Sequence, residues 1–120
     1  MKKIIKTDNA PKPIGPYNQA VIAGNYMFIS GQIALNPKNG ELVTNDINNE
    51  TTQVMENLKA ILSESSLTFD NVVKTTIFLS AINQVVKISE FVRLPSEIII
   101  SAGKYPAVEI DVKSKVISQV

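Results

Sequence analysis

The sequence predicts an α+β fold in which a mixed β-sheet carries two helices packed on one of its faces. Several short segments are rich in β-branched residues or alternate apolar with polar residues, which is the pattern of strands. Two longer segments repeat their apolar residues every three to four positions, which is the period of an α-helix. The order is hairpin strands, helix, strand, helix and strands. Because strands joined through helices must often run parallel, a mixed sheet is the simplest arrangement.

The chain begins with a short strand and an extended segment. Residues 2–7, KKIIKT, form an edge-like strand candidate. The following stretch APKPIGPY contains Pro11, Pro13 and Pro16, which remove backbone donors and force an extended path. We interpret these prolines as structural.

A hairpin is predicted next. Residues 18–33 read as two strands joined at Gly24 and Asn25, because both residue types accept a positive φ. A further turn follows, with Asn39-Gly40 at its tip.

Residues 46–66 are predicted to form an amphipathic helix. Asp46, Asn48 or Asn49 can cap its start, and the serines after Glu64 end it. Its apolar residues fall on one stripe: Val54, Met55, Leu58, Ile61 and Leu62.

The second half continues the alternation of strand and helix. Residues 71–79, NVVKTTIFL, are rich in β-branched residues and predict a central strand. Residues 81–95 return to helical spacing and end at Pro95. Residues 107–112, AVEIDV, predict another strand, followed by a weaker one in KVISQV. With both helices on one face, the other face of the sheet is uncovered, which favours a homo-oligomer.

Composition restricts the chemistry that the chain can perform. The 120 residues form a single domain, residues 1–120, with 44% apolar residues and a net charge of +1. That charge does not indicate a dedicated nucleic-acid binder. Cysteine and histidine are both absent, which excludes disulfides, thiolate nucleophiles and the commonest metal ligand. The available groups are carboxylates, hydroxyls, lysines, the backbone and the single arginine, Arg93.

No segment predicts export or membrane insertion. Only Ile4 and Ile5 separate the first two lysines from Lys6, which is too short for a signal peptide. No apolar stretch approaches the ~20 residues of a spanning helix. We therefore expect a cytoplasmic protein without a membrane partner.

Four motifs together resemble one protein family. The segments DNAPKPIGPYNQAV, FISGQIALNPKNGEL, NLKAIL and NVVKTTIFL are similar to the RidA/YjgF family, also described as reactive intermediate deaminases or liver perchloric-acid-soluble protein. The resemblance implies a chorismate-mutase-like fold assembled as a homotrimer, with ligand clefts between subunits. It also implies hydrolysis of enamines or imines, such as 2-aminoacrylate, to 2-keto acids and ammonia, without metal or organic cofactor.

The resemblance assigns candidate site residues. Tyr17, Ser30 and Gly31 would form the catalytic cleft, where the glycine lets a small imine or 2-keto acid approach the backbone. Adding water to an imine requires a held carboxylate, a positioned water and nearby proton donors or acceptors. A site without histidine is therefore chemically reasonable.

Each of these three residues also has a purely structural interpretation. Gly31 would mark a β-bulge or tight packing in the strand that it interrupts. Ser30 would be a satisfied hydroxyl inside the sheet, and Tyr17 a packed aromatic residue with its hydroxyl at the surface. Similarly, Glu109 and Asp111 fit a solvated strand face better than an acid/base pair.

The last quarter of the chain departs from the family pattern. Family members carry an arginine directly after a [YF]-P-A stretch, and its planar guanidinium binds the substrate carboxylate through two hydrogen bonds. Here Ala107 completes Tyr-Pro-Ala but Val108 follows, and the glutamate of the last strand has no clear counterpart. Ala107 remains a candidate substrate-binding residue. Arg93 is a weak candidate anchor for the carboxylate, because a solvated position near a helix end is the simpler interpretation.

The sequence leaves two functions open and disfavours a third. The chain is either an enamine/imine deaminase or a trimeric small-acid-binding protein with weak or no catalysis. The family has also been described as ribonucleases. However, the lysines that could contact phosphates are scattered, and no stacking platform is visible, so we do not expect a nucleic-acid partner. These lysines are Lys2, Lys3, Lys6, Lys113 and Lys115.

Overall fold

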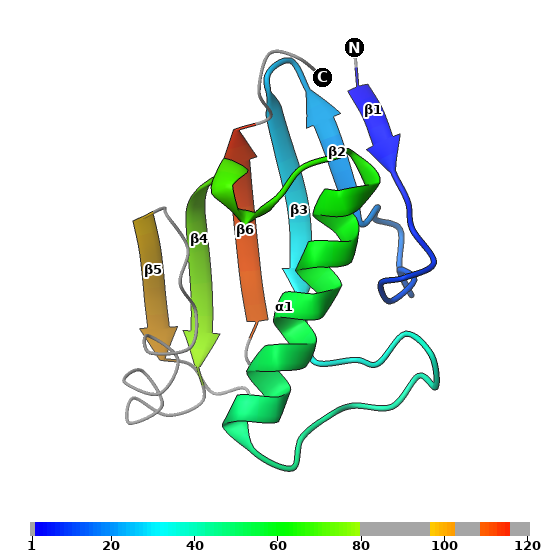
Figure 1. The fold of residues 1–120 in the computed structure, drawn as a ribbon, viewed down its shortest axis with the longest axis vertical. Coiled ribbons are helices and arrows are strands. Elements are labelled where there is room, and N and C mark those ends of the chain that lie inside the picture. The colour runs from blue at the N-terminus through cyan, green and yellow to red at the C-terminus, as the bar shows by residue number, and fades with distance from the viewer. Residues whose placement is uncertain (1, 80–96, 103–108, 116–120) are drawn as a thin grey trace.

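A six-stranded mixed sheet with one long helix across it forms the part of the chain that the computed structural model describes, residues 2–79, 97–102 and 109–115. The strands lie in the order β1-β2-β3-β6-β4-β5 (Figure 1). All neighbouring pairs are antiparallel except β4 and β5, which run parallel. The predictions of an α+β chain and of a mixed sheet are confirmed. The elements are β1 (Lys2–Ile5), β2 (Ala20–Ala23), β3 (Tyr26–Gln32), α1 (Ile47–Glu64), a 3₁₀ turn η1 (Phe69–Asn71), β4 (Val72–Leu79), β5 (Glu97–Ala102) and β6 (Glu109–Lys115).

Both predicted turns form where glycine allows a positive φ. The strands β2 and β3 pair as a hairpin with Ala23 opposite Tyr26, and Gly24 between them has φ +60°. In the later turn, Gly40 has φ +74°, and its N–H donates to the carbonyl of Asn36 at 2.8 Å. Few other residue types adopt this left-handed conformation without strain.

The helix α1 covers one face of the sheet and supplies four of the buried apolar residues of the described core (Figure 1). Of its predicted apolar stripe, Met55 is partly buried against the core, and the other four residues are fully buried: Val54, Leu58, Ile61 and Leu62. From the sheet, β2 and β3 contribute Ala20, Ile22, Met27 and Ile29 to the same core. The described helices are too short or too polar to cross a membrane.

Asp46 caps the start of α1, as one of the three predicted candidates. Its Oδ1 accepts the N–H of Asn49 at 2.8 Å, and its Oδ2 accepts the side-chain amide of Asn49 at 2.9 Å. We expect Asp46→Ala to lower the free energy of unfolding by about 1 kcal/mol, because an orphan N–H of the first turn loses its acceptor. Urea denaturation followed by circular dichroism measures this change. Glu56→Ala, at an exposed position inside the same helix, should change it by only a few tenths of a kcal/mol, and equal losses in the two variants would contradict the capping role.

The second half of the sheet agrees with the sequence in part. The predicted strand over residues 71–79 is β4, which lies between β6 and β5. A single strand, β6, spans parts of both C-terminal segments that were predicted as strands. The strand β5 was not predicted. The predicted helix over residues 81–95, and with it the placement of two helices on one face, lies outside the described residues.

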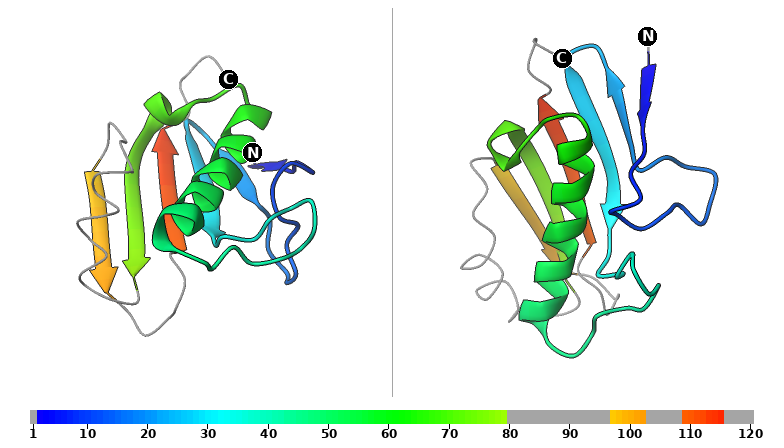
Figure 2. Two further views of the ribbon diagram at one scale, coloured as in Figure 1. Left: turned by 60° about the horizontal axis from the view of Figure 1, so that its bottom comes forward. Right: turned by 45° about the vertical axis from the view of Figure 1, so that its right-hand side comes forward.

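The face of the sheet opposite α1 carries exposed apolar side chains. The exposed Ile4 and Phe28 and the half-buried Val21 between them are in register across β1, β2 and β3, so they form a row on one face. Tyr26 lies two residues from Phe28 and shares that face, and Val73 on β4 is also exposed. Figure 2 shows that α1 lies on one side of the sheet, and no other described helix lies on the opposite side.

Candidate functional site

A β-bulge interrupts β3 at the Ser30-Gly31 step. Ile29 pairs with Val112 of β6, and Gln32 pairs with Ile110, so three steps along β3 match two steps along β6. One extra residue is therefore inserted into β3, and the strand bends there. Gly31 is exposed at this bend, whereas Ile29 and Gln32 on either side are buried. The structural interpretation of Gly31 as a bulge residue is confirmed.

Ser30 connects the bulge to the segment that follows Tyr17. The backbone N–H of Ser30 donates to the carbonyl of Gln19 at 3.0 Å, and its hydroxyl donates to the carbonyl of Asn18 at 2.5 Å. On the other side of the bulge, the amide of Gln32 donates to the carbonyls of Ser30 and Gly31. The hydroxyl of Ser30 is thus satisfied, as the structural interpretation expected, and it fixes the segment that carries Tyr17.

Tyr17 lines a hollow of about 470 Å³ beside residues 10–16, which we call the proline-rich loop. The residue is 49% exposed, and its backbone N–H donates to the carbonyl of Gly15 at 2.8 Å. A methyl group on Gly15 would lie 3.4 Å from the ring, so the loop packs closely against it. Asn18 and Gln19, which receive the hydrogen bonds of Ser30, belong to the wall of the same hollow. The structure therefore brings Tyr17 and Ser30 into one local assembly, with Gly31 next along the chain.

Gln19 holds the loop around this hollow, and sequence reasoning missed it. Its side chain is 3% exposed. Its Oε1 accepts the N–H of Thr7 at 2.7 Å, and its Nε2 lies at 3.0, 3.3 and 2.9 Å from the carbonyls of Thr7, Ala10 and Pro11. Because the amide has two hydrogens, one of them is shared between two carbonyls. No spacing rule indicates such a role, since the partners lie eight to twelve residues away.

The hollow beside Tyr17 is lined by charged side chains of both signs. Lys6, Asp8 and Lys12 contribute to its wall. The ammonium of Lys12 lies 3.7 Å from a carboxylate oxygen of Asp8, and both side chains are largely solvated. Such a pair contributes little to stability. The other two candidate site residues, Arg93 and Ala107, lie outside the described residues.

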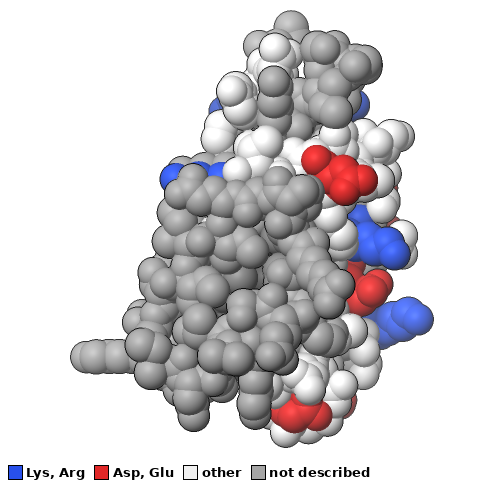
Figure 3. All heavy atoms as spheres, turned by 60° about the vertical axis from the view of Figure 1, so that its left-hand side comes forward, with Lys and Arg blue, Asp and Glu red and all other residues white. Residues whose placement is uncertain are grey.

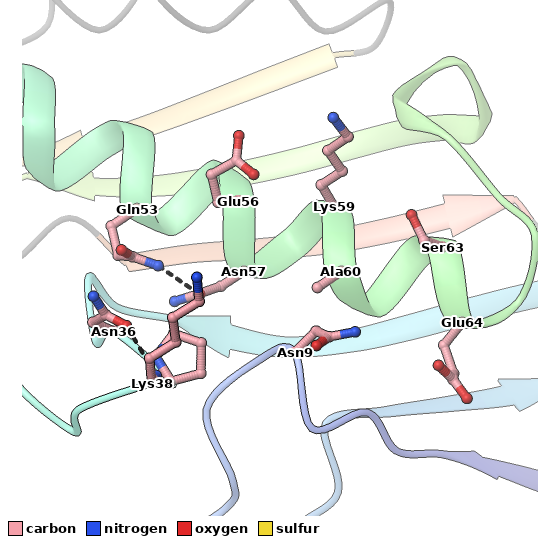
Figure 4. A pocket seen from close by; sticks show the side chains of 11 residues that line it. Asn9, Asn36, Lys38, Gln53, Glu56, Asn57, Lys59, Ala60, Ser63 and Glu64 are labelled. Atoms are coloured by element: carbon pink, nitrogen blue, oxygen red, sulfur yellow. Dashed lines mark hydrogen bonds between the residues drawn. The ribbon is translucent and has the colours of Figure 1, made fainter.

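A second hollow, of about 520 Å³, lies along α1 and contains none of the predicted site residues. Figure 4 shows Gln53 and Asn57 facing Lys38, while Glu56 and Lys59 point away from them. Asn57 is buried, and its amide donates to the carbonyls of Ile33 and Leu35 at 3.1 and 2.9 Å. This buried amide fixes the chain after β3. Its place on the buried stripe of α1, three residues after Val54 and four before Ile61, was a signal that could have identified it.

The described residues on the face in Figure 3 form no patch of a single charge, and the described part of the chain holds no cluster of acidic side chains suited to a metal ion. Acidic and basic side chains alternate along the right-hand edge of the face in Figure 3. No group of three or more Asp and Glu side chains could hold a metal ion within residues 2–79 and the two short C-terminal strands described.

A family model and solved structures match most of the chain, and related sequences match about three quarters of it. The model of the endoribonuclease L-PSP family matches residues 7–113. A RutC family protein of Pyrococcus horikoshii is 51% identical over 90 residues, which cover 75% of this chain and 71% of that protein. A 2-iminobutanoate/2-iminopropanoate deaminase of Dermatophagoides farinae is 44% identical, covering 78% of this chain and 77% of that one. The crystal structure of Escherichia coli TdcF with bound serine superposes with a TM-score of 0.84 at 29% identity, covering 94% and 98% of the two chains.

Proposed function

The chain belongs to the endoribonuclease L-PSP family, which is the RidA/YjgF family that its motifs resemble, and we propose that it hydrolyses reactive enamines and imines to 2-keto acids and ammonia. One observation carries this proposal. The exposed Gly31 bulge is joined through Ser30 to the wall of the hollow that Tyr17 lines. A relative that is 44% identical is named as a deaminase of this kind.

The proposed reaction needs only water and proton transfers. The enamine 2-aminoacrylate takes up a proton at its methylene carbon and becomes 2-iminopropanoate. Water then adds to the imine carbon, and the resulting tetrahedral adduct expels ammonia, which leaves pyruvate. No oxidant or organic cofactor enters this balance, and positioned donors and acceptors are sufficient to accelerate it.

We assign one role to each of the three candidate catalytic residues. Tyr17 is half exposed beside the hollow, and its hydroxyl, which can donate and accept, would pass a proton between the adduct and the attacking water. Ser30 positions the Tyr17 segment through its bond to the carbonyl of Asn18. Gly31, which has no side chain, allows a small acid to lie against the backbone of the bulge. Arg93 and Ala107 remain proposed substrate-binding residues.

We also propose a cytoplasmic homotrimer that works without metal or organic cofactor. The support for oligomerisation is the row of exposed apolar side chains on the sheet face opposite α1. The number of three subunits follows from the family resemblance. Clefts between subunits would then complete the hollow beside Tyr17.

The proposal is tested by the release of pyruvate from 2-aminoacrylate, which a serine dehydratase generates in the cuvette and lactate dehydrogenase with NADH detects. We expect this chain to accelerate the release above the spontaneous rate. Tyr17→Phe should slow the catalysed release about tenfold, because one hydrogen bond to a polar intermediate is lost. Thr52→Val is the control, because it removes a hydroxyl from an exposed residue of α1 that lines neither hollow and lies away from the exposed sheet face, and it should keep the catalysed rate. If the unmodified chain gives no acceleration, the chain is not a deaminase.

The alternative is a trimeric protein that binds a small acid with weak or no catalysis. A specific observation favours it, because the similar structure of Escherichia coli TdcF contains bound serine. In that case, calorimetry would show binding of 2-ketobutyrate while the pyruvate assay stays at the spontaneous rate. The absence of any binding heat would remove this alternative.

Nucleic acid is not the partner that we propose, although the family description contains the word endoribonuclease. The acidic and basic side chains interspersed in Figure 3 do not favour a phosphate backbone on that face. RNA retention on a filter that falls steeply with salt would contradict this expectation.

A further inference from the structure

Lys6 is the described cation best placed to meet an anion in the hollow beside Tyr17. Of the described residues that line this hollow, only Lys6 and Lys12 are positively charged. Lys12 already lies 3.7 Å from the carboxylate of Asp8. No ion-pair partner of Lys6 is seen among residues 2–75, whose side chains the structure describes. An anionic ligand would therefore find its free positive charge at Lys6.

The backbone of Lys6 is fixed on both sides. Ile5, the preceding residue, is buried at the end of β1 and pairs with Ala20. The following residue, Thr7, is clamped at both its N–H and its carbonyl by the buried amide of Gln19. The Cα atom of Lys6 is thus held beside β2, the strand that follows Tyr17 in the chain. Only the side chain of Lys6 is free to change its conformation. Lys12, in contrast, lies between two prolines in the loop.

The substrates proposed above carry a carboxylate at neutral pH. We propose that the ammonium group of Lys6 binds this carboxylate, so that Lys6 selects small 2-keto and 2-imino acids over uncharged carbonyl compounds. This inference rests on the proposed function. An ammonium is a point charge with three donors and binds one carboxylate oxygen at a time, unlike the fork of an arginine. The site therefore holds the acid group loosely, while the hollow beside Tyr17 limits its size.

Calorimetric titration with 2-ketobutyrate tests the inference. We expect Lys6→Met to bind this acid about tenfold more weakly than the unmodified chain, because a charged hydrogen bond is lost. Lys6→Arg should restore most of the affinity. Lys59→Met, on the exposed side of α1, is the matched control for the loss of one positive charge and should leave the affinity unchanged. The uncharged amide of 2-ketobutyrate should bind equally to the unmodified chain and to Lys6→Met.

The outcomes separate this inference from the proposed function. If the unmodified chain binds 2-ketobutyrate and Lys6→Met binds it equally well, the carboxylate contact is not Lys6 and the inference is overturned. The same holds if Lys12→Met, rather than Lys6→Met, loses affinity. If the unmodified chain neither binds the acid nor accelerates pyruvate release, the proposed function fails and the inference fails with it. The circular dichroism of each variant shows that the fold is retained, since both lysine side chains are exposed.

Discussion

Replacing Gln19 with leucine should lower the free energy of unfolding by about 3 kcal/mol and release the loop around the candidate site. The side chain is 3% exposed and contacts four backbone groups of Thr7, Ala10 and Pro11. A hydrogen bond contributes about 0.5–1.5 kcal/mol, and a buried group left without a partner costs about 1–3 kcal/mol. Leucine has a similar volume, so lost packing adds little. Urea denaturation followed by circular dichroism gives the change in free energy.

A matched control separates the loss of the Gln19 hydrogen bonds to the loop from the general effect of a glutamine-to-leucine change. Gln53 on α1 is half-buried, and its Nε2 donates to Asn57 Oδ1 at 2.9 Å. Gln53→Leu should therefore lower the free energy of unfolding by only about 1 kcal/mol. Hydrogen exchange gives a second readout, because the N–H of Thr7 should lose protection in Gln19→Leu and keep it in Gln53→Leu. Equal losses of stability together with an unchanged Thr7 amide would show that Gln19 does not hold the loop.

Sequence patterns were sufficient to predict the elements that depend on residues close to one another in the chain. The glycine at the β2–β3 turn, the capping Asp46 and the apolar stripe of α1 each depend on residues within a few positions of one another. The strand β5 was missed for the opposite reason. A short apolar run such as Ile98 to Ile100 has no periodicity of its own, and its parallel pairing with β4 joins residues more than twenty positions apart.

The candidate site shows the same division. The bulge at Gly31 and the satisfied hydroxyl of Ser30 could be anticipated, because a glycine and a small hydroxyl inside an apolar strand are unusual there. The hydrogen bonds of Gln19 could not, since they depend on how the proline-rich loop returns to bring its carbonyls to the Gln19 amide. The sequence also did not indicate that Lys6 lies near Tyr17, because the two residues stand on opposite sides of that loop in the chain. Only the tertiary structure places them on one wall.

The exposed face of the sheet leads to the second large effect. Ile4, Val21 and Phe28 lie in one row across three strands, with Tyr26 beside them, and Phe28 is 46% exposed. An apolar patch of this kind favours association, because joining two such faces removes both from water. A glutamate at position 28 would place a charge in that buried seam, where desolvation opposes it strongly. Within a single chain, the same glutamate stays solvated, so the fold should persist.

If the protein is the proposed homotrimer, we expect Phe28→Glu to lower its mass from three times the chain mass of 13.1 kDa to that of a folded single chain. Sedimentation equilibrium measures the mass, and circular dichroism confirms that the helix remains. Ile14→Glu is the control for the same kind of change, because Ile14 lies in the proline-rich loop and is 96% exposed. It should leave the mass unchanged. A Phe28→Glu protein that keeps its full mass would show that this face is not the seam between subunits. If the hollow beside Tyr17 is completed by a neighbouring copy, the single-chain variant should also lose its binding of 2-ketobutyrate, whereas Ile14→Glu should retain it.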